Sequence, residues 1–202
     1  LQITGSEMTE FCRAALWYDE DITIEHCVMN GIKALRECHG NIHLVDCDIQ
    51  SGEFSWRCSD MHISNCRLKG EYPFFECKDM EMDHFHLDGK YSFQYTKGLR
   101  IKHADLNTKD AFWHSENVIV EDSVIRGEYL GWYSKHLKLV RCHIIGTQPL
   151  CYCEGLILED CTMEGCDLSF ENSEVTATIQ GTIESVKNPI SGSINAAHIG
   201  EL

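Results

Sequence analysis

The sequence predicts an all-β fold, a single-stranded right-handed parallel β-helix of about ten coils of 19–21 residues. Two observations lead to this prediction. Apolar residues recur along the whole chain at steps of 21 and 20 residues and then of 19, and small residues, many of them Cys, recur at fixed places within each unit. A regular period of this length is typical of solenoids, in which each unit contacts only its neighbours.

The apolar repeat sets the alignment of the coils. Its first position is apolar in every unit: Leu1, Ile22, Ile42, Met61, Met80, Leu99, Val118, Leu137, Leu156, Val175 and Ile194. The third and eighth positions are also apolar, and Gly recurs at the tenth, where a bend favours a residue without Cβ. We therefore expect residues one period apart to lie above one another, about 4.8 Å apart.

The second half of each unit separates two repeat architectures. A leucine-rich repeat would need a helix or compact turn there, but segments such as Gly70-Glu-Tyr-Pro-Phe-Phe-Glu-Cys77 are aromatic and lack a 3.6-residue period. We expect a triangular coil of three short strands instead. Parallel crossovers favour the right-handed form.

The repeat covers residues 1–202 and predicts one β-helix domain. It weakens over residues 175–202, which we expect to form thinner C-terminal coils or a cap. Leu1 already falls in a predicted strand, with no cap before it. An open strand edge can pair with another chain, so we expect either further N-terminal coils or a homodimer through this end.

Composition and charge limit the partners. With 17 Lys and Arg against 32 Asp and Glu, the formal net charge is −15, which repels phosphate backbones and anionic lipid. No apolar stretch approaches the roughly 18 residues of a membrane span. We expect neither nucleic acid nor membrane as a partner, and a polyanionic ligand only beside a local basic patch or a metal.

Nine of the twelve Cys fall in two columns of the repeat. The members are Cys27, Cys47, Cys66, Cys142 and Cys161 in one, and Cys38, Cys58, Cys77 and Cys153 in the other. Ser, Thr or Ala replaces Cys in other coils, which indicates a small side chain at an inward corner. No paired C-x-x-C motif of a zinc ribbon is present. We interpret the thiols as buried and reduced, which favours a cytoplasmic protein.

Polar residues on either side of the first Cys column suggest two sites. If both flanking positions face outward, His84, His86, His103 and Asp105 form a square that could hold a divalent metal such as zinc. Asp46 and Asp48 would lie near the carboxylate separation of inverting glycosidases and are the candidate catalytic pair. Solvated polar residues on the outside of any β-helix are the simpler explanation of both sets, and no other cofactor is expected.

Aromatic residues form further columns in the second half of the coils. The candidate ligand-binding residues are Tyr72, Tyr91, Tyr95, Asp110, His114, Tyr129 and Tyr133. There are three columns: Tyr72, Tyr91 and Tyr129; the Trp column of Trp17, Trp56, Phe75, Trp113 and Trp132; and Tyr18, Tyr95, His114, Tyr133 and Tyr152. They cannot all point inward, so at least one should face water and offer a surface on which a sugar ring could stack. The alternative is an internal aromatic stack that fills a wide coil, which we expect for the Trp column.

Several segments resemble an uncharacterised bacterial family of β-helix proteins, known by a domain-of-unknown-function label. They are Met8–Tyr18, Gly70–Cys77, Thr108–Asn117, Gly127–Ser134 and Ser185–Gly192. The resemblance covers essentially the whole chain. It implies a pectin-lyase-like right-handed β-helix and a cytoplasmic bacterial protein, and it supplies no catalytic residues. Members are sometimes described as putative hydrogenases, but the paired Cys motifs of a nickel–iron or iron–iron site are absent.

Three functions compete on this evidence. The first is carbohydrate binding through an exposed aromatic face. The second is hydrolysis or lysis of a polysaccharide at the polar His/Asp face. The third is a non-catalytic interaction scaffold.

Overall fold

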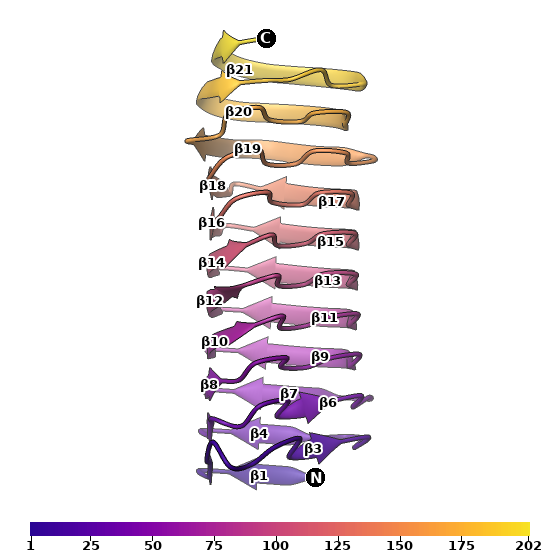
Figure 1. The fold of residues 1–202 in the computed structure, drawn as a ribbon, viewed down its shortest axis with the longest axis vertical. Coiled ribbons are helices and arrows are strands. Elements are labelled where there is room, and N and C mark those ends of the chain that lie inside the picture. Colours follow the sequence, from indigo (N-terminus) through magenta and orange to yellow (C-terminus); the bar gives the residue numbers. More distant parts are fainter.

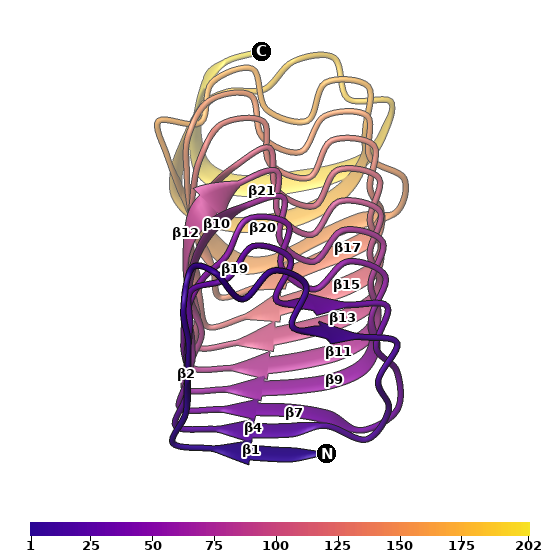
Figure 2. The same ribbon diagram turned by 60° about the horizontal axis from the view of Figure 1, so that its bottom comes forward.

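The computed structural model describes all residues 1–202 and consists of strands and turns without any helix. The chain winds into a rod of about eleven turns with the termini at opposite ends (Figure 1). From the N-terminal end the chain runs clockwise as it recedes, so the solenoid is right-handed (Figure 2). A leucine-rich repeat is excluded because no helix occupies the second half of a coil and each coil contributes strands to two parallel sheets. No segment forms a helix that could cross a membrane.

One long side of the rod is a parallel sheet, here called sheet A. Its strands are β1 (Gln2–Thr4), β4 (Thr23–Glu25), β7 (Ile42–Val45), β9 (Ser59–Ser64), β11 (Lys78–Asp83), β13 (Lys97–Lys102), β15 (Glu116–Glu121), β17 (Lys135–Val140), β19 (Leu156–Glu164), β20 (Glu174–Ser185) and β21 (Ser191–Glu201). The register between neighbours follows the predicted repeat: Ile42 pairs with Met61, and Met80 pairs with Leu99. The period of 19 residues in the sequence is therefore the number of residues in one coil of the β-helix.

A second parallel sheet, sheet B, follows sheet A around a corner. Its strands are β2 (Glu7–Met8), β5 (Val28–Met29), β8 (Asp48–Gln50), β10 (Arg67–Glu71), β12 (His86–Lys90), β14 (Asp105–Lys109), β16 (Val124–Arg126) and β18 (His143–Ile145), and it ends on residues 162–164 of β19. The residue at this first corner has a φ near +50° in successive coils, as at Asn65, His84 and His103. Asn, Asp and His tolerate this left-handed conformation better than most residues.

The third side of the coil is not a sheet, so the prediction of three strands per coil is wrong. Only β3 (Leu16–Trp17) and β6 (Leu35–Arg36) form a two-stranded ladder there. In later coils every second residue has a positive φ, as at Tyr91, Phe93 and Tyr95, with values of 58–59°. This alternation keeps aromatic residues stacked from rung to rung but breaks the extended geometry of a strand. We call these segments, such as residues 72–76, the turn side.

The core is a continuous stack of inward columns. The first, third and eighth positions of the repeat are buried in the central coils, as at Met80, Met82 and Leu87. The turn side adds fully buried rings: Phe93 stacks on Phe74 and Phe112, with ring centroids 5.1 and 5.0 Å apart and interplanar angles of 2° and 9°. The side chains of neighbouring rungs thus pack directly on one another.

The Cys columns lie inside the corners, as the sequence predicts. All twelve Cys are free thiols and eleven are buried. The Cys66 thiol donates to the Ser64 carbonyl (3.2 Å), and the Cys47 amide donates to the Cys66 sulfur (3.4 Å). In another coil the Ser123 hydroxyl makes the same two contacts, donating to Glu121 O and accepting from Ala104 N. Cys and Ser interchange because the corner needs a small side chain that can both donate and accept.

Burial keeps several of these thiols protonated. It raises the pKa of Cys166 to about 12, and that of Cys153 to about 11. Because the thiolate is the reactive form, these side chains are inert packing groups.

The C-terminal coils are narrower than the rest. Leu156 pairs with Val175, one full period on, but Val175 pairs with Gly192 and Ala177 with Ile194. The sequence alignment that placed Ile194 above Val175 is therefore wrong by two residues. The register shifts by one more residue between Ile179 and Thr182, and β20 and β21 run on past the corner.

Candidate functional site

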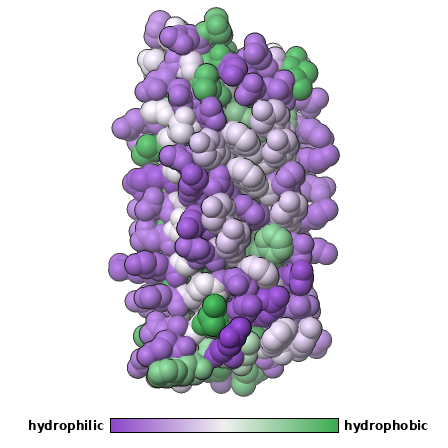
Figure 3. All heavy atoms as spheres, viewed as in Figure 1, coloured by the Kyte–Doolittle hydropathy of each residue, from purple (hydrophilic) through white to green (hydrophobic).

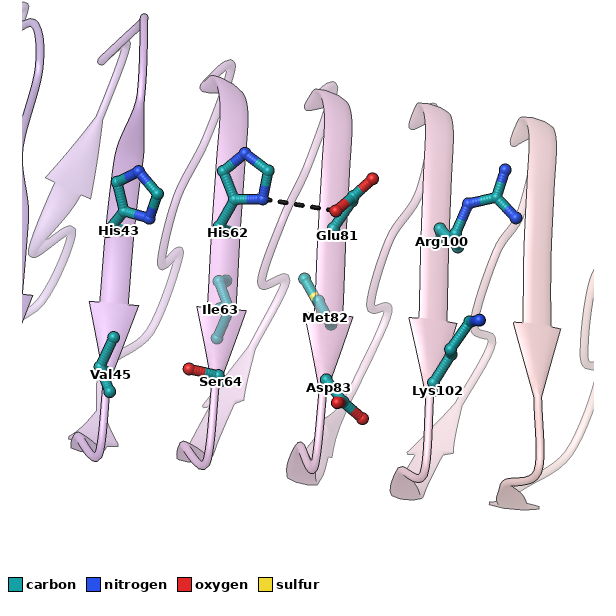
Figure 4. A pocket seen from close by; sticks show the side chains of 10 residues that line it. All are labelled: His43, Val45, His62, Ile63, Ser64, Glu81, Met82, Asp83, Arg100 and Lys102. Atoms are coloured by element: carbon teal, nitrogen blue, oxygen red, sulfur yellow. Dashed lines mark ion pairs between the residues drawn. The ribbon is translucent and has the colours of Figure 1, made fainter.

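The outer face of sheet A carries an open groove that crosses strands β7, β9, β11 and β13. One row of side chains across neighbouring strands consists of His43, His62, Glu81 and Arg100, and a second row consists of Val45, Ser64, Asp83 and Lys102. They line a depression of about 470 Å³ (Figure 4). We call it the sheet-A groove.

The groove continues along the start of the same strands. A second depression of about 400 Å³ shares His62, Glu81 and Arg100 with the first. Its outer rim is a column of residues with a positive φ, including Asn41, Asp60, Asp79, Gly98 and Asn117. The two depressions form one polar surface that runs parallel to the rod axis, from β7 to β15.

The polar groups of the groove are only partly matched. The rings of His43 and His62 stack 5.0 Å apart at an interplanar angle of 14°, and His62 Nδ1 lies 3.5 Å from Glu81 Oε2. Lys102 pairs with Glu121 (3.2 Å). Arg100 has no charged partner, and Figure 4 shows its guanidinium extending beyond its own strand toward β15. The groove thus presents free donors beside a carboxylate.

Sequence reasoning missed the sheet-A groove. His43 and His62 were visible as His at the second position of consecutive coils, followed by Glu81 and Arg100. The second position lies within a strand and faces outward between two inward residues. A search for titratable residues repeating at this position would have found the groove.

The predicted four-residue metal square is not formed. It assumed that His84 and His86 flank Phe85, which occupies the first Cys column in this coil, on one extended strand. The positive φ of His84 instead turns the chain between β11 and β12. His86 lies in sheet B, 3.2 Å from Asp88 and 3.8 Å from Asp105, and Asp105 is already bound by Arg126.

The structure brings together a different set of metal-compatible side chains. Asp83, His84 and His103 place one ligand atom each within 4.8 Å of the others. Asp83 completes this set. In the sequence it is one of many outward acidic residues, so no pattern distinguishes it.

Asp46 and Asp48 lie on either side of the first corner. Asp46 has a φ of 52° and follows the last residue of β7, whereas Asp48 begins β8. Asp46 Oδ2 is 3.5 Å from His26 Nδ1. Both carboxylates are exposed, and neither lines the sheet-A groove. Their catalytic role stays a prediction.

Four of the aromatic positions form one surface stack on the turn side. Tyr95, His114, Tyr133 and Tyr152 follow one another at centroid distances of 4.9, 4.9 and 4.8 Å, with interplanar angles of 10°, 7° and 12°. We call this the ring ladder. Since both faces of His114 and Tyr133 are covered by neighbours, the ladder presents ring edges and hydroxyls to solvent. Below it the same column continues as Glu76, Arg57 and Glu37, which are ion-paired.

The other candidate ligand-binding residues form a shorter column. Tyr72 stacks on Tyr91 at 4.5 Å, and Tyr129 contacts Trp132 edge to face at 5.3 Å. Asp110 lies between Tyr91 and Tyr129 and is only 4% exposed, and this burial raises its pKa.

The Trp side chains are tied to the backbone. Trp113 and Trp132 stack with an interplanar angle of 4°, and their indole N–H groups donate to Tyr129 O and Gln148 O, each at 2.7 Å. Arg36 lies over the rings of both Trp17 and Trp56. Figure 3 shows that this face is largely hydrophilic, with side chains of intermediate hydropathy along its middle and only isolated hydrophobic ones.

These features define a right-handed parallel β-helix protein with an open polar groove along one sheet and stacked aromatic residues opposite. The chain belongs to the family described as "Protein of unknown function (DUF3737)", whose model matches residues 1–202. A search of curated proteins finds no match.

Solved structures show distant likeness. The mannuronan C-5 epimerase AlgE4 A-module of Azotobacter vinelandii has a TM-score of 0.45 and 10% identity, over 90% of this chain and 64% of that one. The fluoroquinolone resistance protein QnrB1 has a TM-score of 0.33 and 10% identity, over 97% of this chain and 89% of that one. The periplasmic alginate epimerase AlgG, as a double mutant, has a TM-score of 0.32 and 6% identity, over 100% and 74%. This chain therefore spans less than two thirds of the epimerase module, and such low similarity transfers no residue roles.

Proposed function

We propose that this protein binds a linear glycan chain lengthwise along the sheet-A groove. The observation that supports this most directly is the shape and lining of the groove. It is open, shallow and elongated, crosses five neighbouring strands from β7 to β15, and repeats polar side chains at every rung. An extended polymer fits such a surface better than a compact ligand, which prefers a closed pocket.

The chemistry of the lining suits hydroxyl groups. Glu81 supplies two acceptor oxygens, and Arg100 supplies guanidinium donors that no carboxylate occupies. Neighbouring hydroxyls on a sugar ring can accept from one and donate to the other. The imidazole of His62 adds a flat edge beside them. A glycan without charge suits the surface best, since the net charge of −15 opposes a polyanion.

The ring ladder is a less suitable surface for the same ligand. A sugar ring stacks on the face of an aromatic ring, but the faces of His114 and Tyr133 are already covered by their neighbours. Its exposed hydroxyls could hydrogen-bond to a ligand without stacking. A glycan site on this side would therefore depend on Tyr hydroxyls.

The test is binding to a panel of neutral polysaccharides, by glycan array and then by affinity measurement on any ligand retained. Arg100→Ala should weaken binding at least about tenfold, because it removes charge-assisted hydrogen bonds to the ligand. Arg67→Ala is the matched control, since Arg67 is also an exposed strand residue but lies on β10, in sheet B. It should leave the affinity within about twofold.

The variant Tyr133→Phe distinguishes the two faces. It removes one hydroxyl of the ring ladder and keeps the stacked ring. If this variant loses binding while Arg100→Ala does not, the sheet-A groove is not the site. Retention of no glycan by the wild-type protein would reject the proposal altogether.

A further inference from the structure

Two histidines and one aspartate converge at the edge of the sheet-A groove. Asp83 is the last residue of β11, His84 follows it at the first corner, and His103 occupies the same corner one rung on. His103 Nδ1 lies 2.8 Å from Asp83 Oδ1, and His84 Nδ1 lies 3.0 Å from the same oxygen. One carboxylate oxygen is thus the common neighbour of both imidazole nitrogens.

We propose that Asp83, His84 and His103 form a zinc-binding site. In a tetrahedral site with bonds of 2.0–2.1 Å, ligand atoms lie about 3.3 Å apart. The two nitrogen–oxygen distances are within about half an ångström of this value. All three ligand atoms lie within 4.8 Å of one another, so side-chain rotation can bring them around one ion.

The positions of the two imidazole rings support a shared site. The His84 and His103 rings have centroids 4.9 Å apart and an interplanar angle of 34°. The Nδ1 atoms of both rings lie within 3.0 Å of Asp83 Oδ1, so the two imidazoles meet at one carboxylate. The His43 and His62 rings are equally close, at 5.0 Å, but lie at 14° and do not form a three-ligand group with Glu81. The second pair is an internal comparison in which similar residues stack without converging.

The surrounding charges leave the three ligands available. Lys102 is next to Asp83 in register, but its ammonium pairs with Glu121 at 3.2 Å. Arg141 lies two rungs above His103 in the corner column, beyond Asp122, and is held by both carboxylate oxygens of Asp122, at 2.6 and 2.7 Å. No cation therefore competes with the metal for Asp83.

Two nitrogens and one oxygen are a ligand set typical of zinc with an open coordination position. The three side chains are exposed, so water or a ligand group can reach that position. Because Asp83 also lines the groove, a metal here would lie at its edge. The zinc site does not depend on the proposed glycan binding, and each can fail without the other.

The test uses Co²⁺ as a spectroscopic probe and Zn²⁺ as a competitor, on the full chain with Cys12→Ser to remove the one thiol that is not buried. We expect one ion per chain and d–d absorption bands without the intense charge-transfer band of a thiolate ligand. The variant His103→Asn should weaken affinity at least about tenfold. Asn is chosen because Asn65 occupies the same corner column with a positive φ, so the backbone tolerates it.

The variant His62→Asn is the matched control. It removes a histidine of sheet A that also has an acidic neighbour, and it should leave metal affinity within about twofold. Absence of a stoichiometric ion, a thiolate band, or equal losses in His62→Asn and His103→Asn would each overturn the proposal. Circular dichroism of each variant establishes that the fold is retained.

Discussion

The outer face of sheet A and the turn side repeat their side chains at the same rung spacing but use them differently. On the turn side, rings stack on rings, and the Trp N–H groups donate to backbone carbonyls one rung on. On sheet A the second-position column changes from His to Glu to Arg, and Arg100 has no charged partner. In a column of aromatic residues, the rings stack on one another and the Trp N–H groups are hydrogen-bonded, so the column stabilises the rod. A column of unlike polar residues leaves groups free for a ligand.

The largest test of this comparison is removal of a ring from the interior of the turn side. Phe93→Ala should lower the free energy of unfolding by about 3–5 kcal/mol, because it leaves a cavity between Phe74 and Phe112. His62→Ala on the outer face of sheet A should change it by less than about 0.5 kcal/mol. Urea unfolding measures both. Similar losses in the two variants would contradict the division between a stabilising and a binding side.

A smaller effect tests the hydrogen bonds that close the turn side. Trp132→Phe keeps an aromatic ring beside Trp113 but removes the donor to Gln148 O. We expect a loss of about 1 kcal/mol, seen as a lower urea midpoint with an unchanged m value. Trp17→Phe is the control, because Trp17 is exposed and its indole N–H makes no such bond. The idea fails if Trp17→Phe costs as much.

The smallest expected effect concerns Asp110, an ionisable residue that lies between Tyr91 and Tyr129 on the turn side. Burial raises the pKa of Asp110 above its ordinary value of 3.8. Below the unfolded-state pKa, the protonated carboxyl makes its full contribution to the free energy of unfolding. This contribution is lost as the pH rises through the higher folded-state pKa. At pH 7 the buried carboxylate therefore destabilises the fold.

Asp110→Asn should consequently raise the melting temperature at pH 7 by about 1–3 °C. Asn also tolerates the φ of 55° at this position. The gain should shrink at pH 4, where a larger fraction of the wild-type carboxyl is protonated than at pH 7. Thermal melts at the two pH values measure the difference, and a gain that is equal or larger at pH 4 would show that ionisation is not the cause.

How much of the candidate site the sequence could reveal is shown by His84 and His86. Alternation along an extended strand predicts that both point outward on one face, and this failed because His84 has a φ of 51°. The column containing Asn65, His84, His103 and Asp122 is rich in residues that tolerate this conformation, so a corner could have been inferred there. The partners of each His could not, because a left-handed residue redirects the side chains that follow it.

The sequence by itself determined the rung length, the inward columns and the buried Cys corners. Side chains buried in one rung pack on those of the rung before, so residues of similar size recur in the sequence at the rung length. Only the tertiary structure decided that Asp83 joins His84 and His103, that aromatic rings cover one another, and that two rows of outward side chains line one groove. Those contacts depend on where the chain turns between sheets and on side-chain directions, and the repeat does not encode either.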